Sequence, residues 1–298
     1  MQGTGPARIG LVLGAGGVTG DAFHRGVIRA LHEAGFDART AVLIVGTSAG
    51  SMVGAFLRRP EEMGTALYDA TVHGRKLGWA PDLSPYLAAM RRPWDARAGV
   101  LFASLLPTGR RSTEFLVAGL RSRHGNDWPE RRLYVVGVRR RDGKRVVFGR
   151  DGAPHTDVAH AVAASCAIPG YFHPVEIDGE MYVDGGVHSP TNADVTNGWE
   201  LDVLIVSSPM SVDLRGIRPT IDLGARLLFH RYLQKELAHH RRRGTRVLTF
   251  EPGGELLSVM GLNPLRGARI DEIEAMSAER ATSVLNASEA LAGLRTAA

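Results

Sequence analysis

Short apolar runs alternate with stretches of helical periodicity along this chain. The runs have the length of buried β-strands and lie at residues 9–13, 41–45, 201–207 and 246–250. Apolar residues three and four positions apart predict helices at 21–34, 61–72, 112–123, 156–164, 221–243 and 271–294. This alternation is typical of an α/β fold with a mostly parallel central sheet.

One pair of strands departs from the parallel pattern. Leu133–Val138 and Arg145–Phe148 both have strand composition, and Asp142-Gly143 between them is a favoured turn sequence. We therefore expect an antiparallel hairpin in the otherwise parallel sheet. The sequence contains no internal repeat and no long linker, which favours a single domain over residues 1–298.

The segment 75–108 follows neither period, and it is apolar and rich in proline. Six basic residues lie within it or just after it and would form a basic rim: Arg75, Lys76, Arg91, Arg92, Arg110 and Arg111. Two interpretations are equally open: an irregular packed excursion, or a lid or lipid-facing wall over a binding site. The second would add peripheral contact with an anionic membrane.

The charge of the chain is basic, with a net charge of +5. Arginine pairs and triples recur along the sequence, which would attract phosphate on nucleic acid or on an anionic membrane. The runs are scattered and are not interleaved with aromatic residues, so we favour a solvated surface and expect no nucleic-acid partner. Cys166 is the single cysteine, and we see neither a membrane-spanning stretch nor a signal peptide. We expect a cytoplasmic protein.

A glycine-rich turn, Gly14-Ala15-Gly16-Gly17-Val18-Thr19-Gly20, follows the first strand. A dinucleotide site is one alternative, but Thr19 stands where its third glycine belongs, and the next strand carries no acid for a ribose. A tight turn with close helix packing is another alternative. The third is an oxyanion hole, in which unpaired backbone N–H groups at a helix start point to one place.

The second strand leads into Gly46-Thr47-Ser48-Ala49-Gly50, which fits the pattern G-x-S-x-G. A nucleophile on a sharp strand-to-helix turn needs glycine two residues before and after it, because a Cβ there would collide with the neighbouring chain. The pattern alone is weak in a chain with 36 glycines, but the strand before it and the helix after it favour Ser48 as a nucleophile.

Far downstream, Asp184-Gly185-Gly186 follows a short apolar strand. A carboxylate on such a tight turn can serve an active site, although the same sequence is also a common turn. Taken together in this order, the three motifs resemble those of the patatin-like phospholipases, which are acyl hydrolases with a Ser-Asp dyad. The segment Ala164–Val175 also resembles the family's connection before the aspartate.

The resemblance implies a three-layer α/β/α sandwich and a lipid acyl hydrolase that cleaves carboxylic esters. Ser48 would be the nucleophile and Asp184 the general base, while the N–H groups of Ala15, Gly16 and Gly17 would hold the oxyanion. The supporting glycines of the three motifs would be Gly14, Gly20, Gly46, Gly50, Gly185 and Gly186. No cofactor or metal is needed for this chemistry.

The sequence also departs from the family. Thr19 occupies a position where the family often has a basic residue, so phosphate contacts there are in doubt. An acyltransferase that uses the same dyad stays open, and so does a non-enzymatic basic protein that binds anionic lipid or nucleic acid. A histidine could also enter the site, and the candidates near the motifs are His24, His173 and His188.

Overall fold

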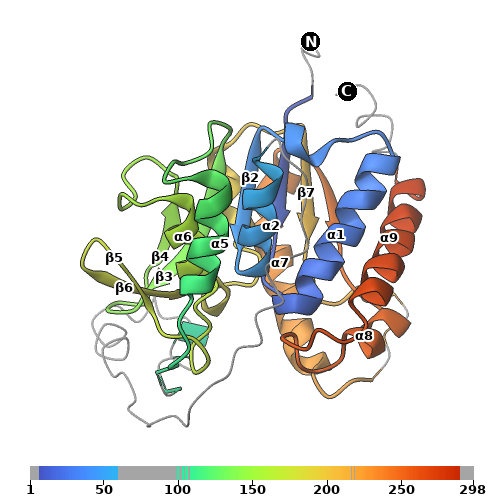
Figure 1. Cartoon of the computed structure of the whole chain (residues 1–298). Coiled ribbons are helices and arrows are strands. Elements are labelled where there is room, and N and C mark those ends of the chain that lie inside the picture. Colours follow the sequence, from blue (N-terminus) through green and yellow to red (C-terminus); the bar gives the residue numbers. More distant parts are fainter. Residues whose placement is uncertain are drawn as a thin grey trace. The chain divides into compact units, whose positions relative to one another are not determined.

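The computed structural model of the protein describes residues 7–59, 99–100, 103, 105–106, 108–215, 217 and 219–288. The chain divides into two compact units (Figure 1). The first unit comprises Met1–Val45 with Thr191–Ala298, and the second comprises Gly46–Pro190. The predicted helix at 61–72 and most of the segment 75–108 lie outside the described residues.

The first unit is built on three parallel strands. Strand β1 (Ile9–Leu13) pairs with β7 (Val203–Ser207), and β7 pairs with β8 (Arg246–Phe250). Every residue of β1 and β7 is buried. Strands buried on both faces need a layer of helices on each side, which explains their continuous apolar sequence.

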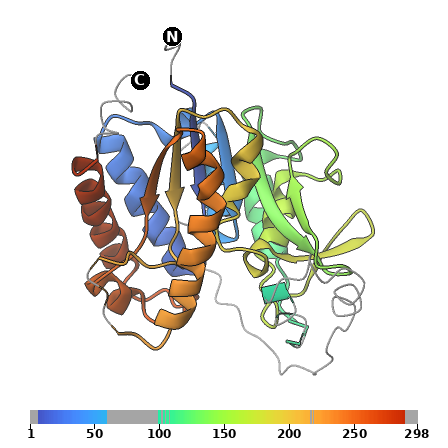
Figure 2. The same ribbon diagram turned by 180° about the vertical axis from the view of Figure 1, so that it is seen from behind.

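Helices cover both faces of these strands. Helices α1 (Gly17–Glu33) and α9 (Ile270–Asn286) lie against each other on one face (Figure 1). A Cβ at Gly26 would collide with the backbone of α9, so this glycine allows the two helices to approach closely. Helix α7 (Leu223–Arg242) covers the other face (Figure 2).

Shorter elements complete the first unit. They are the α-helix α8 (Glu255–Met260) and the 3₁₀ helices η1 (Ala38–Thr40) and η4 (Ala193–Gly198). Strand β2 (Leu43–Thr47) carries the chain from the first unit into the second.

The strands of the second unit are antiparallel. Strand β3 (Leu133–Arg139) pairs with β4 (Arg145–Phe148) and, along its other edge, with β6 (Glu180–Asp184). Strand β6 in turn forms a hairpin with β5 (Val175–Ile177). The β5–β6 turn, Asp178-Gly179, has positive φ angles at both residues, as a tight hairpin requires.

Among the described residues, the second unit includes the following α-helices and 3₁₀ helix. They are α2 (Ala49–Leu57), α5 (Glu114–His124), α6 (Val158–Ser165) and η3 (Gly185–Val187). Helix α6 is rich in alanine and valine and packs on β3. Its first turn is capped by Asp157, whose carboxylate accepts a hydrogen bond from the His160 N–H.

The predicted α/β fold, with a mostly parallel central sheet and an antiparallel hairpin, is confirmed. Several boundaries differ from the prediction, and two of them lie beside the candidate motifs. Helix α1 begins at Gly17 instead of Asp21, because packing of Gly16 and Gly20 against Pro209 stabilises a helical first turn in a glycine-rich sequence. Strand β2 ends two residues later than predicted, at Thr47. The single domain stays a prediction.

Candidate active site

Ser48 occupies a strained turn between a strand and a helix. Strand β2 ends at the residue before it, and α2 begins at the residue after it. Its φ and ψ angles are 54° and −122°, a combination that residues with a side chain rarely adopt. Such a conformation costs about 1–3 kcal/mol and persists only where the surroundings hold it in place.

Gly46, two residues before Ser48, and Gly185, directly after Asp184, are sterically required. A Cβ at Gly46 would collide with the Cα of Ser51, so no other residue fits beneath the turn. A Cβ at Gly185 would collide with the carbonyl oxygen of Val136. The reason given from the sequence for the first glycine of the G-x-S-x-G pattern therefore applies in the folded protein.

Asp184 ends strand β6, and its carboxylate lies beside Ser48. The Ser48 hydroxyl donates a hydrogen bond to this carboxylate, and the Gly186 N–H donates another over 2.7 Å. Both side chains are almost completely buried, with Ser48 4% and Asp184 5% exposed. The structure thus brings together two residues that lie 136 positions apart in the sequence.

Burial sets the protonation behaviour of Asp184. It raises the pKa of the carboxyl group from 3.8 to about 6, against the opposing effect of the hydrogen bonds from Ser48 and Gly186. At neutral pH the group is therefore still mainly a carboxylate, but it binds a proton far more readily than an exposed aspartate. A buried carboxylate that accepts a serine proton can act as a general base.

The glycine-rich turn of the first unit presents unpaired N–H groups. The Gly14 N–H donates to the Ser207 carbonyl oxygen over 3.0 Å, and the Thr19 N–H donates to the Pro264 carbonyl oxygen over 3.1 Å. Ala15, Gly16 and Gly17 lie between these two residues, and their N–H groups have no acceptor within the described part of the chain. These groups precede or begin α1, where the helix dipole favours negative charge.

Comparison with known proteins identifies the family. The family model described as patatin-like phospholipase matches residues 11–196, which is more than half of the chain. The chain belongs to the patatin-like phospholipase family. Its predicted resemblance to this family is therefore confirmed.

Curated relatives of this patatin-like chain include uncharacterised NTE family proteins of Mycobacterium bovis and Mycobacterium tuberculosis. Each is 31% identical to it over 205 residues, which are 66% of this chain and 49% of the relative. The chain thus spans about half the length of these relatives.

Two solved structures also match. VipD from Legionella pneumophila is 14% identical with a TM-score of 0.42, and the match covers 95% of this chain and 67% of VipD. The type III effector ExoU is 15% identical with the same TM-score, and the match covers 95% of this chain and 53% of ExoU.

Among the histidines near the motifs of this patatin-like chain, His24 has a clear structural role. His24 is fully buried in the first unit, where Nε2 donates to the Gly14 carbonyl oxygen and Nδ1 accepts from the Ser207 hydroxyl. Burial lowers its pKa to about 4, so the ring is neutral and braces the glycine-rich turn. His173 donates from Nδ1 to the Pro174 carbonyl oxygen. His188 donates its backbone N–H to the Gly185 carbonyl oxygen.

Two residues of the site carried no assigned role in the sequence prediction. The Ser165 hydroxyl bonds the backbone of Ser48, and the Cys166 thiol lies within hydrogen-bond reach of the Ser48 side chain. Burial and the Asp184 charge raise the pKa of the thiol, so it stays protonated. Their position in the connecting segment was the available signal, but only the folded chain shows that this segment reaches the nucleophile.

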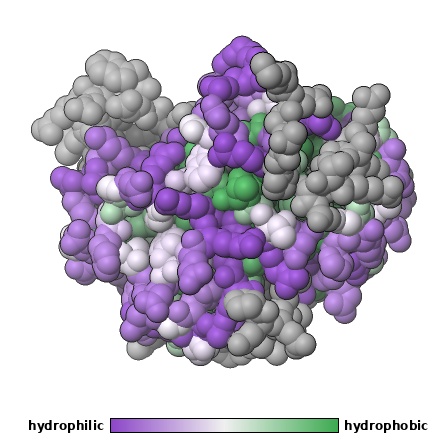
Figure 3. Space-filling model, turned by 90° about the horizontal axis from the view of Figure 1, so that it is seen from above, coloured by the Kyte–Doolittle hydropathy of each residue, from purple (hydrophilic) through white to green (hydrophobic). Residues whose placement is uncertain are grey.

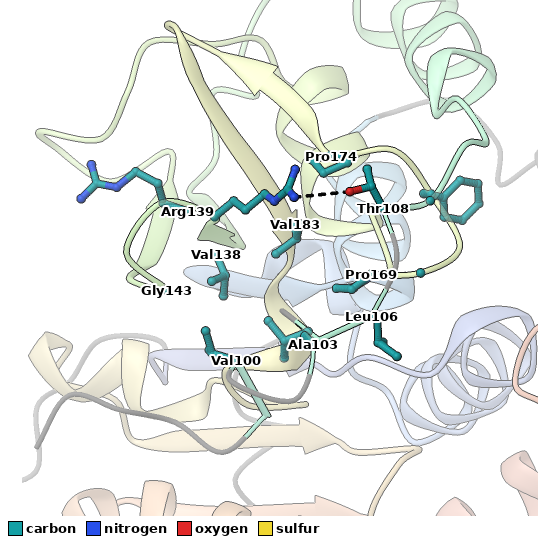
Figure 4. Close-up of a pocket in the computed structure, with 15 residues that line it drawn as sticks. Val100, Ala103, Leu106, Thr108, Val138, Arg139, Gly143, Pro169, Pro174 and Val183 are labelled. Carbon is teal, nitrogen blue, oxygen red and sulfur yellow. Dashed lines mark hydrogen bonds between the residues drawn. The ribbon is translucent and has the colours of Figure 1, made fainter. Parts of the chain in front are cut away.

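A small apolar cavity of about 40 Å³ lies elsewhere in the second unit (Figure 4). Val138 and Val183, which pair across β3 and β6, line one side of it. Asp184 is the next residue along β6, so its side chain points to the opposite face of the sheet. The cavity is therefore not part of the Ser48–Asp184 site.

The described part of the predicted insertion closes this cavity. Val100, Ala103 and Leu106 contribute apolar side chains to its lining. The hydroxyl of Thr108 accepts a hydrogen bond from Arg140, drawn as a dashed line in Figure 4. The lid or lipid-facing wall stays a prediction, because the rest of 75–108 lies outside the described residues.

Many arginines are engaged within the protein. Arg139 pairs with Asp142, and Arg141 pairs with Glu180. Hydrophilic residues dominate the face drawn in Figure 3, which agrees with charged side chains that are spread over a solvated surface. Arg111 stacks on the ring of Tyr171, with 4.1 Å between its guanidinium carbon and the ring centroid.

The described residues offer neither a metal site nor a membrane-spanning helix. They contain no group of three or more His, Cys, Asp or Glu side chains placed to hold a metal ion. They also contain no helix with the length and apolar character needed to cross a bilayer.

Proposed function

We propose that the protein is a lipid acyl hydrolase that forms an acyl-enzyme at Ser48, with Asp184 as the general base. One observation carries the proposal: the hydroxyl of a serine on a strained strand-to-helix turn donates a hydrogen bond to a buried carboxylate. Membership of the patatin-like phospholipase family supports the same reaction class.

The proposed reaction has two steps. Ser48 Oγ attacks the carbonyl carbon of an ester while its proton passes to Asp184, and the proton then leaves with the alcohol as the C–O bond breaks. Water attacks the acyl-enzyme in the second step and gives its proton to Asp184. The serine hydroxyl recovers that proton as the carboxylic acid departs.

We further propose that the N–H groups of Ala15, Gly16 and Gly17 stabilise the oxyanion of each tetrahedral intermediate. The observations that support this proposal come from the first unit alone: these N–H groups have no acceptor among the described residues, and they lie at the start of α1. Hydrogen bonds to a developing negative charge supply a large part of catalysis in acyl transfer. The turn is also held by the Thr19 N–H, which donates to the Pro264 carbonyl oxygen.

The test of the dyad uses a fluorophosphonate probe, which reacts with activated serines. We expect labelling of the wild type, none in Ser48→Ala, and a rate at least about a hundredfold lower in Asp184→Asn, the scale of general-base catalysis. Ser277→Ala is the control, since Ser277 is a buried serine of α9 whose hydroxyl donates to the Ile273 carbonyl oxygen. Labelling that persists in folded Ser48→Ala would refute the assignment.

The substrate class needs a separate experiment. Short p-nitrophenyl esters should be compared with vesicles of phosphatidylglycerol and of phosphatidylcholine, at low and high salt. Hydrolysis of vesicle lipid supports the proposed activity and the predicted peripheral contact with anionic membranes. Turnover of short soluble esters alone, with no binding or cleavage of either vesicle, contradicts the lipid substrate.

The acyltransferase and the non-enzymatic binding protein, which are the two alternatives, predict different experimental outcomes. An acyltransferase would form a new ester when an acceptor alcohol is added, at the expense of free fatty acid. A non-enzymatic basic protein would bind DNA or anionic vesicles in a salt-sensitive way and hydrolyse no ester, and Ser48→Ala would leave that binding unchanged.

A further inference from the structure

The segment that ends α6 makes two contacts with the Ser48–Asp184 pair. The Ser48 N–H donates a hydrogen bond to Ser165 Oγ over 2.9 Å. Two residues later, the carbonyl oxygen of Ala167 accepts a hydrogen bond from the Asp184 N–H over 3.0 Å. One short stretch of chain therefore holds the backbone of both residues.

Ser165 is itself fixed by the sheet. Its hydroxyl is fully buried and donates to the carbonyl oxygen of Val136, in strand β3, over 2.6 Å. The same carbonyl oxygen lies against Gly185, directly after Asp184, where a Cβ would collide with it. Val136 thus supports the turn of the nucleophile through Ser165 and contacts the turn of the base directly.

The hydrogen bond from the Ser48 N–H to Ser165 stabilises the unfavourable backbone conformation of the turn. A positive φ angle at Ser48 is unfavourable for a residue with a side chain, so neighbouring groups must hold it. The orientation of the Ser48 N–H fixes the direction of the Cα–Cβ bond, and with it the place of the hydroxyl. A side-chain acceptor that is locked by β3 is well suited to do this.

We propose that Ser165 is a positioning residue that, together with the Ala167 carbonyl group, sets the spacing between the Ser48 hydroxyl and the Asp184 carboxylate. This inference rests on the proposed function and assigns a role to the segment Ser165–Ala167. The Ser165 hydroxyl donates to the Val136 carbonyl oxygen and accepts from the Ser48 N–H. Its bonds are therefore to backbone groups and not to the Ser48 hydroxyl or the Asp184 carboxylate.

The principal test compares Ser165→Ala with Ser277→Ala. Both wild-type serines are buried and donate to a backbone carbonyl oxygen over 2.6 Å, but Ser277 lies in α9, which belongs to the first unit. We expect Ser165→Ala to lower kcat about 10- to 100-fold with little change in KM, since a misplacement of about 1 Å can cost that much. Ser277→Ala should keep the wild-type kcat.

The pH profile separates positioning from a general loss of structure. The hydrogen bond from Ser48 opposes the rise in the Asp184 pKa, so weakening it should move the acid limb of kcat/KM to higher pH in Ser165→Ala. Ser165→Thr keeps a hydroxyl and should restore part of the rate. An unchanged kcat and an unchanged acid limb in folded Ser165→Ala would overturn the inference.

Hydrogen exchange tests the structural part without relying on activity. The peptide that contains the Ser48 N–H should exchange faster in Ser165→Ala than in Ser277→Ala, and equal exchange would contradict the bond. If Ser165→Ala fails to fold, Ser165→Cys serves in its place, because sulfur is a weaker acceptor of similar shape. Failure of the wild type to react with a fluorophosphonate would refute the proposed function, whereas the exchange result would still decide the role of Ser165.

Discussion

Replacing Asp184 by asparagine should make the folded protein more stable at pH 8 while it abolishes turnover. The carboxylate is held in a buried place that raises its pKa from 3.8 to about 6. A rise of about two units corresponds to about 3 kcal/mol of lost unfolding free energy when the group is ionised. Asparagine has a similar shape and carries no charge to desolvate.

The sign of the effect fixes its pH window. Because the folded state binds the Asp184 proton more tightly than the unfolded state, the wild type is most stable below pH 3.8 with respect to this group. It loses that stability as the pH rises from 3.8 to about 6, and above that range the loss is complete. The advantage of Asp184→Asn over the wild type should therefore grow by about 3 kcal/mol from the acid end to pH 8.

Urea unfolding of both proteins between pH 4 and pH 8 measures this difference directly. Asp157→Asn is a matched control of opposite sign. Although partial burial raises the Asp157 pKa, hydrogen bonds from His160 and Arg121 bring it below its usual value. Asp157→Asn should therefore destabilise the protein near neutral pH, and less so in acid.

The outcome that refutes this reasoning is a constant difference between Asp184→Asn and the wild type across the pH range. It would mean that the Asp184 pKa is the same in the folded and the unfolded states. A serine hydroxyl and one backbone N–H would then compensate fully for burial.

Three further predictions use other parts of the site. Because Asp184 must be ionised to act, kcat/KM of the wild type should rise about tenfold from pH 5 to pH 7, with a midpoint near pH 6, and a flat profile would contradict this. The buried Cys166 thiol should react with Ellman's reagent only after denaturation, and rapid reaction of the native protein would oppose the raised pKa. Gly46→Ala should abolish fluorophosphonate labelling because its Cβ would collide with Ser51, whereas Gly198→Ala, with open space around its Cβ, should label normally.

The sequence by itself determined the class of fold and singled out Ser48 and Asp184 as candidates for the site. Strands β1 and β8 lie at their predicted positions. For β1 the reason is a five-residue apolar run that is followed by a helical pattern. The β3–β4 hairpin could also be predicted from a short stretch of sequence, since the Asp142-Gly143 turn links the two strands directly. Ser48 could be singled out because the strand, the turn and the helix around it are all encoded within a few residues.

Only the tertiary structure decided how these residues meet. No local pattern could state that Asp184 reaches Ser48, because the hydrogen bond joins segments that are distant along the chain. The same holds for Ser165, whose hydroxyl connects the nucleophile turn to β3, and for His24, which braces Gly14. Helix α1 began earlier than predicted because Pro209 packs against Gly16 and Gly20, a contact that outweighs the low helix propensity of glycine. Local propensity fixes where elements form, whereas long-range packing and the satisfaction of buried polar groups fix which side chains face each other.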